Sequence, residues 1–115
     1  MYKSSIELIR HIEAEAGFIL KHTKDKNFEQ FYTDEVLKRA VIRALEIIGE
    51  ASKKVDPDFK AKNEYIEWKY MAKMRDLLIH HYMGVDYSVV WKTITNDLPE
   101  MYFQIQKILE KNNGS

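Results

Sequence analysis

The stretch RDLLIHHY, from Arg75 to Tyr82, holds the side chains of this 115-residue chain that are best suited to chemistry. An arginine can bind a phosphate through a fork of donors, a histidine can transfer a proton near neutral pH, and a tyrosine hydroxyl can be modified or can hold a substrate. The combination of Arg75, His80, His81 and Tyr82 therefore favours the cleavage or the recognition of a phosphodiester.

Helical spacing places the two main candidates on different sides of their helix. Arg75 lies in an apolar stripe, and His80 lies about 140° away around the helix axis. A charged group in such a stripe is costly unless it is paired, so we expect a carboxylate partner such as Glu46 or Glu50, or a pocket that binds an anion. The two side chains can meet at one substrate if the helix unwinds before Gly84, or if a second copy of the chain completes a symmetric groove. We favour the groove.

Each candidate also has a structural interpretation. Arg75 fits a buried ion pair, His81 fits a packing histidine, and Tyr82 fits a core aromatic whose hydroxyl reaches the surface. His11 and His22 have no partner at a spacing that indicates a site. The residue types alone therefore leave both a catalytic cluster and a packed helix end open.

Composition indicates one folded helical domain. Hydrophobic residues make up 45% of the chain and charged residues 31%, with four glycines and two prolines. The absence of cysteine excludes disulfides, a thiol nucleophile and thiolate metal ligands. No apolar run is long enough for a secretion signal or a membrane span, so we expect a cytoplasmic protein without membrane contact.

The charges balance overall but not locally. The chain has 18 basic and 18 acidic residues, which argues against a protein that coats nucleic acid by charge alone. Residues 38–75 carry ten basic and six acidic side chains, so an anionic ligand would prefer this region. A solvated helix face is the alternative explanation for these lysines and arginines.

Apolar residues recur with helical spacing along nearly the whole chain, and no segment alternates as a half-buried strand does. We predict an all-α fold, an antiparallel bundle of four or five helices in a homodimer. One domain is expected over residues 1–110, with a frayed tail over 111–115. The first predicted helix begins at a capping box formed by Ser4 and Glu7, the second runs from Thr33 to near Val55, and the third runs from Tyr65 to His81. A fourth is predicted from a cap at Asp86 to Thr95, and a fifth begins at a capping box formed by Asp97 and Glu100.

The motif resembles a known signature. Arginine, four residues, histidine, any residue and tyrosine is similar to the pattern of the HEPN superfamily, in particular the HepT-like ribonuclease toxins of bacterial and archaeal toxin–antitoxin pairs. Three longer segments also resemble this family, so the resemblance covers nearly the whole chain. They are RALEIIGEASKKV (43–55), IEWKYMAKMRDLLIHHYMGVD (66–86) and VWKTITNDLPEMYFQI (90–105).

The resemblance implies a helical dimer in which the motifs of two subunits line one cleft. His80 would take the proton from an RNA 2′-hydroxyl that attacks the adjacent phosphorus, without a metal or any other cofactor. Arg75 would neutralise the charge on the pentacovalent phosphate, and Asp76 would orient the arginine or the histidine. The adjacent His81 leaves open which of the two histidines faces the cleft.

The resemblance also implies regulation by a partner. A small nucleotidyltransferase antitoxin would transfer AMP from ATP to Tyr82, adding bulk and negative charge that block the cleft. Two other functions stay open. One is a non-catalytic helical dimer that binds a nucleotidyltransferase partner or a nucleotide, and the other is a structural homodimer in which Arg75 belongs to an interface ion pair.

Overall fold

The computed structural model describes residues 4–79 and 84–113, and the side chains of all these residues except 76–79 and 113. Every element in these ranges is helical, which confirms the all-α class. The homodimer stays a prediction. The elements are α1 (Ser5–Thr23), α2 (Phe28–Tyr32), α3 (Glu35–Lys54), α4 (Pro57–Lys62), α5 (Trp68–Ile79), α6 (Tyr87–Lys92), the π-helical turn η1 (Thr93–Asp97) and α7 (Leu98–Asn113).

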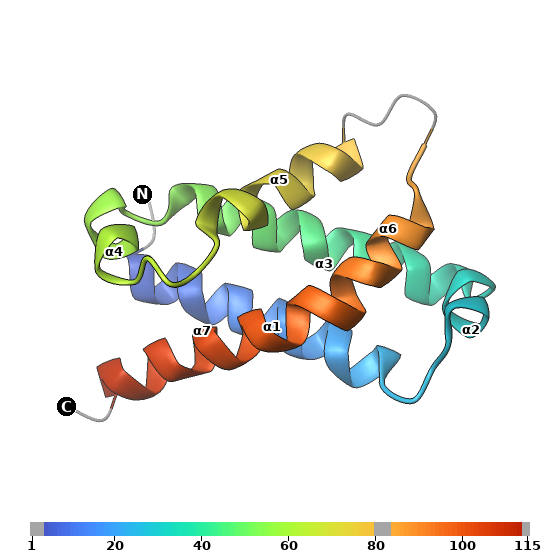
Figure 1. Ribbon diagram of the computed structural model, residues 1–115, viewed down its shortest axis with the longest axis horizontal. Helices are drawn as coiled ribbons and strands as arrows, with labels where there is room; N and C mark the ends of the chain where they lie inside the picture. Colours follow the sequence, from blue (N-terminus) through green and yellow to red (C-terminus); the bar gives the residue numbers. More distant parts are fainter. Residues whose placement is uncertain (1–3, 80–83, 114–115) are drawn as a thin grey trace.

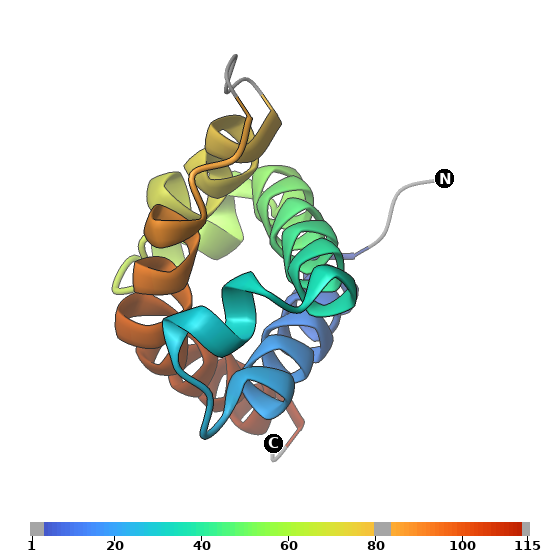
Figure 2. The same cartoon turned by 90° about the vertical axis from the view of Figure 1, so that its right-hand side faces the viewer.

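Four long helical segments run alternately up and down the bundle (Figure 1). They are α1, α3, α5 and the continuous path from α6 through η1 to α7. Helix α3 packs against both α1 and α5, and α1 packs against α7. The short helices α2 and α4 lie at opposite ends of the bundle (Figure 1), and the view along the helices in Figure 2 shows the long segments arranged around a common centre.

Apolar side chains from these segments meet in one core. The helices α1, α3 and α7 each contribute buried apolar side chains at helical spacing to this core. Each large apolar side chain that is fully buried contributes about 1.5–3 kcal/mol. The fully buried side chains include Ile9, Ile12, Ile19, Phe31, Val41, Leu45, Ile48, Met71, Ile94, Leu98, Ile105 and Ile108.

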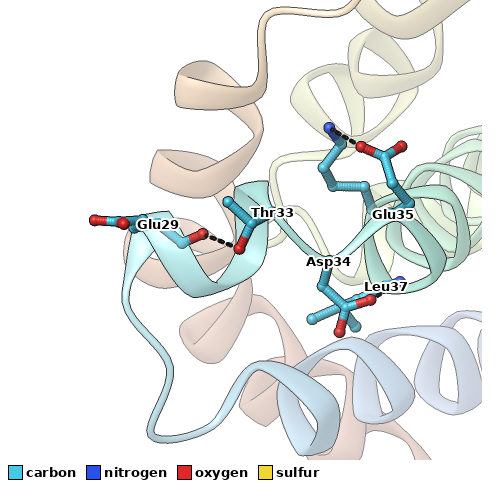
Figure 3. A network of polar contacts seen from close by, with 6 residues as sticks. Glu29, Thr33, Asp34, Glu35 and Leu37 are labelled. Carbon is cyan, nitrogen blue, oxygen red and sulfur yellow. Dashed lines mark hydrogen bonds and ion pairs between the residues drawn. The ribbon is translucent and has the colours of Figure 1, made fainter.

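The predicted cap at Ser4 is present, since its side chain accepts a hydrogen bond from the Glu7 backbone N–H at 3.3 Å. The predicted start of the second helix at Thr33 is wrong by one residue. Asp34 caps α3 by accepting from the Leu37 N–H at 3.0 Å, while the Thr33 hydroxyl donates back to the Glu29 carbonyl at 2.8 Å (Figure 3). Thr33 therefore ends α2, a helix too short to show in the periodicity of the sequence.

The start of α5 also differs from the prediction. The helix begins at Trp68 rather than at Tyr65, because the buried Trp68 indole N–H donates to the Asn63 carbonyl at 3.1 Å and ties the preceding turn to the helix. The predicted loop between the second and third helices contains α4, which starts at Pro57, where a proline is pre-shaped for a first helical turn.

The two helices predicted after Gly84 form one continuous path. Asp86 caps α6 as predicted, accepting from the Ser88 and Val89 N–H groups. The predicted cap at Asp97 is wrong, because the chain continues from η1 directly into α7. Pro99 has no N–H to offer the preceding turn, and a π turn just before it relieves the clash that a proline ring causes in a regular helix.

Asp97 has a different partner. Its carboxylate accepts a hydrogen bond of 2.5 Å from the Tyr70 hydroxyl, which also lies 3.4 Å from the Thr93 hydroxyl. The π turn is thereby tied to α5. Helix α7 continues through Asn113, three residues into the stretch 111–115 that was predicted as a tail, and the domain boundary at residue 110 stays a prediction. None of the described helices is long and apolar enough to cross a membrane.

Replacing Tyr70 by phenylalanine tests the link between α5 and the π turn. Burial, followed by the hydrogen bond to Asp97, raises the pKa of Tyr70 above its ordinary value of 10.0. The native chain then holds the Tyr70 proton more tightly than the unfolded chain does. The protonated Tyr70 hydroxyl therefore contributes fully to the free energy of unfolding below about pH 10, and this contribution is lost as the pH rises through the pKa of the native state. We expect the urea midpoint of the wild type to fall more steeply above pH 10 than that of Tyr70→Phe. Parallel curves would contradict this assignment.

Candidate functional site

Arg75 lies at a close approach of α5 to α3. A Cβ atom placed on Gly49 would lie 2.5 Å from the Arg75 Cβ and 3.0 Å from the Arg75 backbone nitrogen. The first distance is shorter than real Cβ atoms show and the second is at the tight limit, so a side chain at this position would force α5 or α3 to shift. Sequence analysis did not single out Gly49. The signal that could have identified it is the glycine itself, which lies inside a long predicted helix. A glycine there destabilises the helix by about 1 kcal/mol relative to alanine, so its presence indicates a compensating feature such as close packing.

The Arg75 side chain is positioned by Glu50, the residue after Gly49. Its Nε lies 3.6 Å from the Glu50 Oε1, a distance typical of an ion pair rather than of a hydrogen bond. Glu50, one of the two predicted partners, thus forms an ion pair with Arg75. The side chain of Glu50 is 48% exposed and that of Arg75 29%, although the Arg75 Nε itself is buried. Because an exposed pair contributes only about 0–1 kcal/mol, the main effect of Glu50 is to orient the guanidinium.

This arrangement suits the binding of an anion from solvent. The stem of Arg75 packs against the α3 backbone at Gly49, while part of its side chain stays accessible. A guanidinium held in this way loses little further freedom when it binds a phosphate, and its planar fork matches two phosphate oxygens.

The other predicted site residues are described only in part. Asp76 follows Arg75 on α5, but its side chain is not described. His80, His81 and Tyr82 lie outside the described residues, so the structure does not test their predicted roles. The description resumes at Gly84, whose φ of +102° lies in the region that glycine adopts readily.

A pocket of about 430 Å³ opens elsewhere, between α5 and the α7 path. Three carboxylates and no basic side chain are among the residues around it, so a phosphate would be repelled there and attracted to the neighbourhood of Arg75. Within residues 4–79 and 84–113, no three His, Asp or Glu residues gather closely enough to hold a metal ion. The pocket is lined by Tyr65, Glu67, Tyr70, Asp97, Glu100, Met101 and Gln104.

Comparison with known proteins assigns the family. The family model described as "Ribonuclease HepT-like" matches residues 12–108. A "Probable ribonuclease HepT" of Thermococcus cleftensis is 44% identical over 108 residues, which cover 94% of this chain and 98% of the relative. A "Putative RNase" of Caldanaerobacter subterraneus subsp. tengcongensis is 45% identical over 103 residues, covering 90% of this chain and 92% of the relative.

This chain belongs to the HepT-like ribonuclease family. The family predicted from its motif and longer segments is therefore confirmed. No solved structure matches the chain with comparable significance.

Substituting Gly49 by alanine tests the contact that positions Arg75. The new methyl group forces α5 away from α3, and we expect a loss of about 1–3 kcal/mol in the free energy of unfolding, measured by urea denaturation. Gly17→Ala is the matched control, because the atoms nearest to its Cβ would be those of the Tyr102 side chain, from 3.2 Å, and that ring can shift. We expect Gly17→Ala to stay within about 0.5 kcal/mol of the wild type. A stable Gly49→Ala protein would show that the contact is not required.

Proposed function

We propose that this chain is a metal-independent endoribonuclease toxin in which Arg75 and His80 carry out the cleavage of RNA. The observation that carries the proposal is the oriented, partly exposed guanidinium of Arg75, five positions before His80, in a chain similar to proteins named as ribonucleases. The named relatives support RNA as the substrate class.

The proposed reaction is a transesterification within the RNA. His80 takes the proton of a 2′-hydroxyl, and the freed oxygen forms a bond to the adjacent phosphorus. The bond from phosphorus to the 5′-oxygen breaks, the 5′-oxygen takes up a proton, and a 2′,3′-cyclic phosphate or its hydrolysis product remains. Arg75 stabilises the extra negative charge on the pentacovalent phosphate, and Asp76 assists the orientation of the catalytic side chains.

The proposed active form is a homodimer in the cytoplasm. Regular helical spacing would place His80 about 140° from Arg75 around the helix axis, so one helix would not direct both side chains at one phosphate without unwinding. Two copies of α5 across a symmetry axis can line one cleft and bring the arginine and the histidine to opposite sides of the substrate.

The decisive experiment measures cleavage of RNA by the purified chain in the presence of a chelator. We expect His80→Ala to lower the rate by about 10²–10⁴ and Arg75→Ala by about 10²–10³. Arg75→Lys keeps the charge but loses the fork of donors, so it should restore little activity. His22→Ala and Lys111→Ala, which remove an exposed histidine and an exposed lysine from other helices, should cleave at the wild-type rate.

Three results would contradict the enzyme. Equal cleavage by all variants would identify a contaminant, and RNA binding without cleavage would identify a non-catalytic binding module. If the wild type cleaves no RNA and Arg75→Ala no longer dimerises, as measured by light scattering, the chain is a structural homodimer. His81→Ala settles which of the adjacent histidines acts, and we expect it to retain the wild-type rate.

The proposed regulation is AMP transfer to Tyr82 by a partner nucleotidyltransferase. Because the added phosphate carries negative charge, it would occupy the place of the substrate phosphate. We expect the chain co-expressed with its nucleotidyltransferase to gain the mass of AMP in intact-mass measurements and to lose ribonuclease activity. Tyr82→Phe should gain no mass, whereas Tyr65→Phe, at an exposed tyrosine, should be modified like the wild type. Modification of Tyr82→Phe would show that another residue is the acceptor.

A further inference from the structure

Lys38 of α3 is a charged residue enclosed by aromatic rings. It is 8% exposed, and its Nζ lies 4.3 Å from the ring centroid of Tyr32 and 4.5 Å from that of Tyr87. The same Nζ donates to the Glu35 Oε1 at 3.2 Å. Figure 3 shows Glu35 beside the corner between α2 and α3. An ammonium group between two rings is held by their negative faces, more strongly where water is largely excluded.

The two rings belong to a larger aromatic cluster that joins α2 to α6. Tyr32 and Tyr87 meet edge to face at 5.9 Å, and Phe31 stacks on Trp91 at 5.2 Å. Phe31 also contacts Tyr87 at 6.2 Å. Helix α3 takes part through Lys38 alone among these contacts. We call Tyr32, Lys38 and Tyr87 the cation cluster.

The cation cluster lies at a specific point in the chain. Tyr87 is the first residue of α6, and the cap Asp86 precedes it. The cluster therefore holds the chain at the start of α6, shortly after the stretch from Arg75 to Tyr82. At the beginning of that stretch, α5 contacts α3 where Arg75 meets Gly49.

Both anchors use the same face of α3. Lys38 and Gly49 are eleven positions apart, which at about 100° per residue places them within about 20° of each other around the helix axis. At about 1.5 Å per residue they are separated by roughly 16 Å along it. One helix thus contacts both α5, at Arg75, and the start of α6, at Tyr87.

A lysine is not needed at this position for packing alone. A buried charge can often be replaced by an apolar residue of similar volume at little loss of stability, or even a gain. An ammonium group that must face the rings of Tyr32 and Tyr87, however, restricts how α2 and α6 pack on α3 more than an apolar side chain would.

We propose that Lys38 is a positioning residue for the ribonuclease reaction, holding the start of α6 against α3 through Tyr32 and Tyr87. The inference rests on the proposed function. In this proposal Lys38 acts through Tyr87 on the position of the start of α6 and does not contact the RNA.

The test compares Lys38→Met, Lys38→Arg and the control Lys107→Met. Lys107 lies on α7, is exposed, and has its Nζ 4.9 Å from the Phe103 ring, so its substitution removes a cation–π contact without joining helices. We expect Lys38→Met to fold cooperatively, to lower kcat by about 10- to 100-fold with little change in KM, and to speed hydrogen exchange at residues 87–92. Lys38→Arg should restore most of kcat, and Lys107→Met should match the wild type.

Several outcomes overturn the proposal. The first is a folded Lys38→Met protein whose kcat equals that of the wild type. The second is a Lys38→Arg protein that folds as stably as the wild type but does not regain the kcat lost in Lys38→Met. If Lys38→Met does not fold, Tyr87→Leu carries the same test, since it removes one ring and leaves the lysine. If the wild type cleaves no RNA, the proposed function fails and the positioning role in it falls too. Hydrogen exchange in Lys38→Met then still shows whether the cation cluster holds α6.

Discussion

The contact between Gly49 and the backbone of Arg75 is the constraint on which the candidate site depends. Because Gly49 has no side chain, α5 approaches α3 so closely that the Arg75 Cβ lies only 2.5 Å from the position that a Gly49 Cβ would take. The depth of this approach buries the arginine stem and brings Glu50 within ion-pair distance of its Nε. A charged residue can therefore sit in an apolar stripe with part of its side chain still open to solvent.

Helix α3 organises the molecule around this contact. One side of α3 packs against α1, another packs against α5, and its first turns meet α2 and α6 through Lys38. Its ends are defined locally, by the Asp34 cap and by the turn at Val55. Because one helix contacts the elements on both sides of the motif, small shifts of α3 would move the arginine and the start of α6 together.

Charge separates the two solvent-open regions along α5. The Arg75 side faces α3 and offers a guanidinium to an anion, whereas the pocket at Tyr70 is surrounded by Glu67, Asp97 and Glu100. A chain without net charge can in this way offer a cation to an anionic group at one face and carboxylates that repel it at another. The hydrogen bond from Tyr70 to Asp97 also ties the π turn to α5, so the acidic side has a structural role of its own.

The helical class, the long helices, the caps at Ser4 and Asp86 and the family were all predictable from the sequence, because periodicity, capping and motif spacing are local properties of a chain. The need of Arg75 for a carboxylate was also predictable, since it follows from a charge in an apolar stripe. Only the tertiary structure decided that Glu50 is the partner, that Gly49 permits the approach, that Asp97 binds Tyr70 instead of capping a helix, and that Lys38 is enclosed by rings. These contacts join residues from separate helices, and one-dimensional spacing does not encode how those helices meet.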